Sequence, residues 1–290
     1  MITEEPSPQL TPLNEGQTNP ADSNLGEGLR PTPSVTAMVQ SPWWEVARAG
    51  LVWVGSVGLL LFVPVIVAIP YVVYRLTLVG PVTPEAFAKD PMLIFFSAVG
   101  IIPAHLLTFL IGWLFVTGGG RYPFWKTIGF EWPQNTSATI GTLLSFLLAL
   151  VLLSVAWLLT SFYGGEKTEL DLLIESSMPA RFLLAFAAFA TAPFVEELIY
   201  RGILYTALEK AAGMTIAVFV VSLLFAGVHV WQYRNNVAVI SVITLLSFTL
   251  TLTRALTGKL MPAFIIHLIF NGIQSVLIVL GAFIDHDVLK

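Results

Sequence analysis

The chain has no cysteine and little charge for its length. The lack of cysteine excludes disulfides, thiolate metal sites and a cysteine nucleophile. Charged residues make up 11% of the 290 residues, which is about half the fraction found in a soluble globular domain. No basic cluster of the kind that binds nucleic acid is visible, so we expect no nucleic-acid partner.

Apolar residues take the place of the missing charge. They account for 56% of the chain, and the mean hydropathy is +0.81. Several apolar runs reach the roughly 20 residues that a helix needs to cross a bilayer. The composition therefore predicts an integral, multi-pass membrane protein of the all-α class, with a bundle of about seven (six to eight) transmembrane helices.

The order of polar and apolar segments divides the chain into three parts. Residues 1–42 are rich in Pro, Ser, Thr, Asn and Gly and are expected to form a disordered polar and acidic tail. N-terminal transmembrane helices are expected at 43–180, and a C-terminal transmembrane core at 181–290. Arg254 is expected to extend to lipid headgroups. The seven predicted spans lie at about residues 44–75, 91–117, 138–163, 181–212, 214–231, 237–257 and 260–284.

The stretch FVEELIYRG at residues 194–202 places charge inside one of these apolar spans. A charged side chain near the bilayer centre costs about 2.5–3.5 kcal/mol on insertion scales, so it needs compensation. Glu197 and Arg201 are spaced i, i+4 and are predicted to pair on one helix face. Glu196 points about 100° away, so it remains available for chemistry. Pro193, just before it, is expected to break the helix.

Two further apolar stretches contain histidine. FAGVH places Phe225 and His229 one helical turn apart, and HLIFN does the same for His267 and Asn271. A single histidine in such a span is typical of a hydrogen bond between helices, and we interpret His105 in this way. Phe225 is expected to pack against the ring of His229.

The combination of these residues predicts a reactive site. Glu196, His229, His267 and Asn271 come from three predicted spans, and each can face the interior of one bundle. A carboxylate beside imidazoles can take a proton from water and return it to a leaving amine. An Asn and a His can donate hydrogen bonds to a developing oxyanion. The set fits the hydrolysis of an amide inside the membrane.

The three segments together resemble the CPBP family of intramembrane peptidases, the CAAX prenyl protease and bacteriocin-processing group. Its motifs EExxxR, FxxxH and HxxxN stand here intact and in order, at residues 196–201, 225–229 and 267–271. The resemblance covers about residues 181–284. It implies an endopeptidase that cleaves near the C-terminus of a membrane-associated substrate, either CAAX-like or bacteriocin-like.

The resemblance also implies a role for each motif residue. Glu196 would activate the attacking water with help from His229, while His267 and Asn271 would complete the site and stabilise the oxyanion. The residues that would support this site structurally are Glu197, Arg201 and Phe225.

Metal dependence is left open by the sequence. Glu196, His229 and His267 would supply a His₂Glu ligand set suited to catalytic zinc. The chain has no HExxH motif, and using Glu196 as a ligand would require Glu197 to act as the base. We therefore favour a site without a cofactor, in which a glutamate activates water. A site with Zn²⁺ or another divalent cation is the alternative.

Two other classes of function compete with an enzyme. The chain could be a non-catalytic membrane scaffold or a bacteriocin self-immunity protein. It could also be a transporter with a Glu/His proton relay, although the spans show no obvious inverted repeat. The partners expected for the enzyme are the lipid bilayer and a hydrophobic or lipidated peptide or protein substrate.

Overall fold

The structure is a computed structural model that describes residues 41–80, 83–165 and 167–288. Every regular element in these residues is an α-helix or a π-helix, which confirms the predicted all-α class. The disordered tail predicted for residues 1–42 falls, apart from Ser41 and Pro42, outside the described residues.

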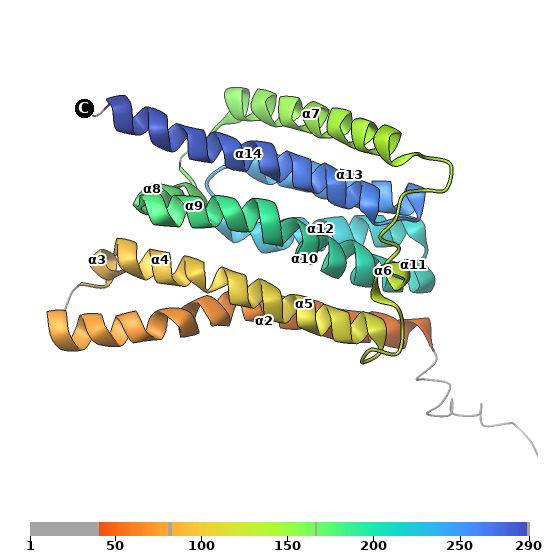
Figure 1. Cartoon of the computed structure of the whole chain (residues 1–290), viewed down its shortest axis with the longest axis horizontal. Coiled ribbons are helices and arrows are strands. Elements are labelled where there is room, and N and C mark those ends of the chain that lie inside the picture. Colours follow the sequence, from red (N-terminus) through yellow and green to blue (C-terminus); the bar gives the residue numbers. More distant parts are fainter. Residues whose placement is uncertain (1–40, 81–82, 166, 289–290) are drawn as a thin grey trace, which may run out of the picture. The chain divides into compact units, whose positions relative to one another are not determined.

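The helices follow one another with short connections (Figure 1). The first part of the chain contains α2 (Pro42–Tyr74), η1 (Arg75–Val79), α3 (Pro84–Ala88), α4 (Pro91–Val99), α5 (Ile101–Thr117), α6 (Phe124–Thr127) and α7 (Ala138–Tyr163). The second part contains α8 (Glu169–Ser176), α9 (Met178–Phe186), η2 (Ala187–Thr191), α10 (Ala192–Glu197), η3 (Leu198–Leu204), α11 (Tyr205–Ala212), α12 (Met214–Tyr233), α13 (Val237–Thr257) and α14 (Met261–Val288). The elements labelled η are π-helical.

Six helical segments of the described residues are long and apolar enough to cross a membrane. They are Pro42–Val79, Pro91–Thr117, Ala138–Tyr163, Met178–Ala212, Val237–Thr257 and Met261–Gly281. The remaining predicted span corresponds to a shorter apolar helix, Met214–Val230, within α12. The chain is thus a multi-pass membrane protein.

Local sequence signals set the helix ends. At the N-termini of α2 and α7, the hydroxyls of Ser41 and Ser137 accept hydrogen bonds from the backbone N–H groups of Trp44 and Ile140. These caps satisfy donors that have no partner inside the helix. Helix α5 stops at Gly118, whose φ of 59° lies in the left-handed region that favours glycine. The predicted end of this span, at about residue 117, is confirmed.

The span that carries EExxxR lies among other helices. Its short middle helix α10 contacts α5 and α14, while α2 packs along α5 and α7 packs along α14 (Figure 1). In its most apolar window 44% of the residues are buried, compared with 17% to 33% in the other five spans. This placement keeps the charged motif away from lipid, as an ionisable group in a membrane requires.

Pro193 breaks this span, as predicted. It has no backbone N–H to continue the helical ladder. The N–H of Ala192 bonds to the carbonyl of Ala187, five residues back, so the turn before the proline is π-helical. The carbonyl of Ala188 therefore receives a hydrogen bond from neither Ala192 nor Pro193. A second π-helical segment, η3, follows Glu197.

Candidate active site

The two charged groups of EExxxR that were predicted to pair do form an ion pair. Arg201 Nη1 donates to Glu197 Oε1 at 2.9 Å, and both side chains are at most 1% exposed. A buried charge is stable only when it is paired and hydrogen-bonded, because desolvation otherwise outweighs its other interactions. This pair supplies that compensation inside the bundle.

Helix α13 completes the environment of the arginine. Arg201 Nε donates to the hydroxyl of Thr251 at 3.1 Å, and Nη2 donates to both the carbonyl and the hydroxyl of Ser247, at 3.0 and 2.9 Å. Each guanidinium nitrogen thus has an acceptor. Sequence analysis missed these two residues. Their signal was a pair of hydroxyls four residues apart in an apolar span.

His267 of α14 lies between the two glutamates. Its Nδ1 is 2.9 Å from Glu197 Oε1, and its Nε2 is 3.6 Å from Glu196 Oε2. An ionised carboxylate can only accept a hydrogen bond, so Nδ1 carries the hydrogen that Glu197 receives. Glu197 thereby fixes the orientation of the ring and directs Nε2 toward Glu196.

The two adjacent glutamates have different surroundings. Glu197 is buried beside Arg201, and its second oxygen, Oε2, is buried without a hydrogen-bond partner among the described residues. The Glu196 side chain is 19% exposed and can be reached by water. The neighbouring carboxylates are therefore suited to different tasks: Glu197 holds its neighbours, and Glu196 is open to a reactant.

His229 of α12 is held through one of its ring nitrogens. Its Nδ1 lies 2.8 Å from the carbonyl oxygen of Phe225, one turn earlier in the same helix. A carbonyl oxygen can only accept, so Nδ1 carries the hydrogen and Nε2 keeps a lone pair in the neutral ring. That nitrogen is able to take a proton from water.

The ring of Phe225 connects the three motifs. Its centroid lies 4.7 Å from that of His229, as predicted, and 6.1 Å from that of His267. The guanidinium carbon of Arg201 lies 4.7 Å from the same centroid, within the range of a cation–π contact. The phenylalanine of FxxxH thus sets the spacing between side chains from η3, α12 and α14.

Asn271 is engaged with the broken helix. Its Nδ2 donates to the carbonyl of Ala188 at 3.0 Å, the carbonyl that lacks a backbone donor because of Pro193. Sequence analysis placed Asn271 at the site as an oxyanion donor, and this contact gives it a second task. An amide nitrogen carries two N–H groups, and this bond uses one of them.

His105 of α5 has the role that was expected of it. Its Nδ1 lies 2.7 Å from the hydroxyl of Thr191 in η2, which is a hydrogen bond between helices.

Arg254 corrects one expectation. It was expected to reach lipid headgroups, but it is only 8% exposed, and its Nη1 donates to the carbonyl of Gly258 at 2.7 Å. The carbonyls at the end of a helix lack partners within the helix, and this side chain supplies one for the end of α13.

Two of the three candidate zinc ligands lie close together, with Glu196 Oε2 3.6 Å from His267 Nε2. Among the described residues, no three His, Asp or Glu side chains gather closely enough to hold a metal ion.

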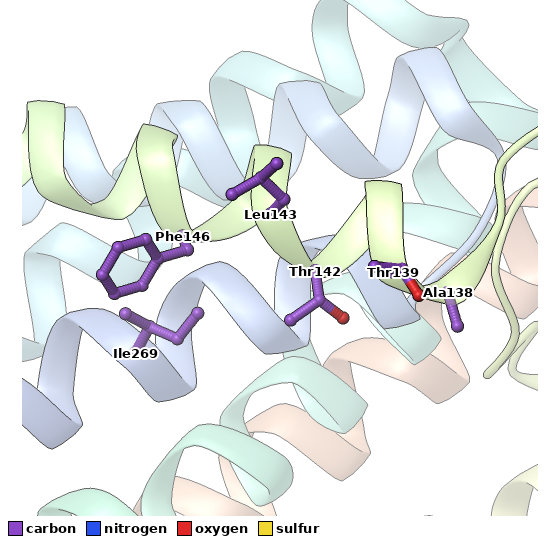
Figure 2. A pocket seen from close by; sticks show the side chains of 6 residues that line it. All are labelled: Ala138, Thr139, Thr142, Leu143, Phe146 and Ile269. Atoms are coloured by element: carbon purple, nitrogen blue, oxygen red, sulfur yellow. The ribbon is translucent and has the colours of Figure 1, made fainter.

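One hollow on the described surface is lined by none of the motif residues. It lies between α7 and α14, where Phe146 faces Ile269, and apolar side chains dominate its lining (Figure 2). None of its lining residues is an acid or a base.

Part of the chain matches a known protein family. Residues 178–273 match the family model described as type II CAAX prenyl endopeptidase Rce1-like. This segment belongs to the Rce1-like family. It contains all three motifs and runs from the start of α9 into α14. No curated protein and no solved structure matches the chain.

The match of this segment indicates the general activity of a CAAX-type intramembrane endopeptidase, which is a hydrolase. The described residues contain six segments that are long and apolar enough to cross a membrane, as such an enzyme requires. The resemblance drawn from EExxxR, FxxxH and HxxxN is confirmed.

The ion pair leads to a stability prediction. In Arg201→Gln, Glu197 is left buried without its cation, and we expect the free energy of unfolding to fall by about 3–5 kcal/mol. The double variant Glu197→Gln/Arg201→Gln removes both charges, so it should recover part of this loss. Thermal unfolding in detergent measures both effects.

The matched control for this test is Arg121→Gln, because Arg121 is exposed in the loop after α5. Its melting temperature should equal that of the wild type. Two results would contradict the role given to the pair. One is an Arg201→Gln variant with the melting temperature of the wild type, and the other is a double variant that is less stable than Arg201→Gln.

Proposed function

We propose that this endopeptidase is of the glutamate type and hydrolyses a peptide bond near the C-terminus of a lipidated, CAAX-like peptide. The observation that carries the proposal is the contrast between the two glutamates. Glu197 is buried against Arg201, whereas the partly exposed Glu196 faces the Nε2 atom of His267. A general base must be reachable by its reactant, and Glu196 meets that condition.

The proposed reaction begins with a water molecule held by Glu196 and His229. Glu196 takes one proton from the water as its oxygen attacks the carbonyl carbon of the scissile bond. The carbonyl oxygen gains the negative charge of the tetrahedral intermediate. When the C–N bond breaks, that charge returns to form the new C=O bond, and the proton passes to the leaving nitrogen. The products are a carboxylic acid and an amine.

The neighbouring groups stabilise the charge that develops. His267 is oriented through its Nδ1 contact with Glu197, so its Nε2 lies on the side of the reacting atoms. Asn271 has one N–H free after donating to Ala188. Hydrogen bonds aimed at an oxyanion are worth more in a site from which water is largely excluded.

The membrane location supports a lipidated substrate. The proposed site lies on a span packed among other spans, and the membrane-spanning helices expose many large apolar side chains. A peptide anchored by a lipid chain is already held at the bilayer, so its C-terminal residues reach such a site without leaving the membrane. The CAAX prenyl description of the matching family is consistent with this substrate class.

Removal of the base tests the proposed function. We expect Glu196→Gln and His229→Ala to lower kcat on a farnesylated peptide with a CAAX-type end by about 10²–10⁴-fold, the usual contribution of a general base. Protein yield and melting temperature should stay near wild-type values, because neither side chain is part of the Arg201 ion pair.

Glu209→Gln is the control, since Glu209 lies on the same span and pairs with Tyr205. It should cleave the peptide at the wild-type rate. Two results would contradict the proposal. One is that the wild-type protein fails to cleave the peptide both with and without its farnesyl group, and the other is that Glu196→Gln is fully active. Full activity in the variant would favour a scaffold or an immunity protein.

Metal dependence is tested separately. We expect purified protein to cleave the farnesylated peptide at an unchanged rate after dialysis against 1,10-phenanthroline, because no step requires a metal. Elemental analysis of the same sample should find no zinc in proportion to protein. A rate that falls with chelation and returns with added Zn²⁺ would overturn the glutamate-type mechanism.

A further inference from the structure

Tyr200 is a further polar residue of the EExxxR segment, and it lies beside the proposed site. It follows Glu196 by four residues on the same helix, so its side chain lies on a similar face one turn later. The residue is 5% exposed, and its ring meets that of Phe225 edge-on, with centroids 5.0 Å apart.

A residue from outside the Rce1-like segment holds the phenol in place. Trp53 of α2 donates its indole Nε1–H to the Tyr200 oxygen at 3.1 Å. An indole N–H can only donate, so the phenol oxygen is the acceptor of this bond and its own hydrogen must point elsewhere. Because the ring is fixed by Phe225 and the oxygen by Trp53, the O–H group is a donor with little freedom to move.

The proposed reaction needs hydrogen-bond donors that stabilise the oxyanion. An oxyanion is stabilised best by several preorganised hydrogen-bond donors, and the loss of one donor typically lowers kcat. Asn271 donates one N–H to the carbonyl of Ala188, so this N–H is not available to bind the oxyanion. The fixed phenol near Glu196 can supply a hydrogen bond that the sequence motifs do not account for.

We propose, on the basis of the proposed hydrolytic function, that Tyr200 is a catalytic residue. Its phenol donates a hydrogen bond to the scissile carbonyl oxygen as that oxygen becomes negative. Trp53 is a positioning residue that acts through the phenol. The O–H bond of Tyr200 stays intact, and the charge it stabilises leaves when the C–N bond breaks. The functional site thus extends to α2, beyond residues 178–273.

The first test is Tyr200→Phe, which removes the hydroxyl and keeps the ring on Phe225. We expect kcat on the farnesylated peptide to fall by about 10²-fold or more, as for loss of an oxyanion donor, with KM unchanged. Tyr205→Phe is the matched control, because this buried tyrosine on the next turn donates to Glu209 instead. Its kcat should match the wild type.

Binding of a transition-state analogue separates catalysis from packing. A phosphinate version of the same farnesylated peptide carries a negative oxygen where the oxyanion forms. Tyr200→Phe should bind it more weakly by the factor lost in kcat/KM, but should bind an uncleavable amide analogue as the wild type does. Equal weakening for both analogues would assign Tyr200 to packing and overturn the proposal.

The role of Trp53 is tested by a double-variant cycle. Trp53→Phe should lower kcat less than Tyr200→Phe, and Trp53→Phe/Tyr200→Phe should be no slower than Tyr200→Phe alone, since the indole acts through the phenol. Additive losses would contradict this. If Glu196→Gln is inactive while Tyr200→Phe keeps full kcat, this inference fails and the proposed function stands. If Glu196→Gln is active, the proposed function fails.

Discussion

The guanidinium of Arg201 is the group on which the rest of the site depends. It lies fully buried between Glu197, Ser247 and Thr251, with an acceptor at each nitrogen. Burying an arginine in a membrane protein is costly, so these acceptors must stay in place. Because Glu197 is held by Arg201, it can in turn hold His267 in one orientation. A chain of contacts from α13 through η3 to α14 thus follows from one buried charge.

Pro193 provides a second constraint, and it acts through the backbone. It leaves the carbonyl of Ala188 without a backbone donor, and Asn271 reaches across from α14 to satisfy it. The break and its partner tie the span that carries the glutamates to the helix that carries His267. Irregular backbone at membrane depth is tolerated only where protein or water covers it, and here a motif residue does so.

Sequence patterns predicted what depends on local spacing. The i, i+4 relation of Glu197 and Arg201 fixed their pairing, the apolar runs located the spans, and Pro193 marked the break. Contacts between helices were out of reach, because they depend on how the spans pack. For that reason the contact of His267 with Glu197 and the acceptors on α13 were not foreseen. The expectation that Arg254 reaches lipid headgroups was wrong for a related reason, because the burial of its side chain also depends on how the helices pack.

The central claim is that Glu196 activates water and forms no covalent bond with the substrate. A single turnover in water labelled with oxygen-18, with enzyme in excess over the farnesylated peptide, tests it directly by mass spectrometry of the new carboxylate. Attack by water predicts one labelled oxygen in every product molecule of this first turnover. Unlabelled product would mean that the oxygen came from an enzyme carboxylate, through an acyl intermediate, and would contradict the account.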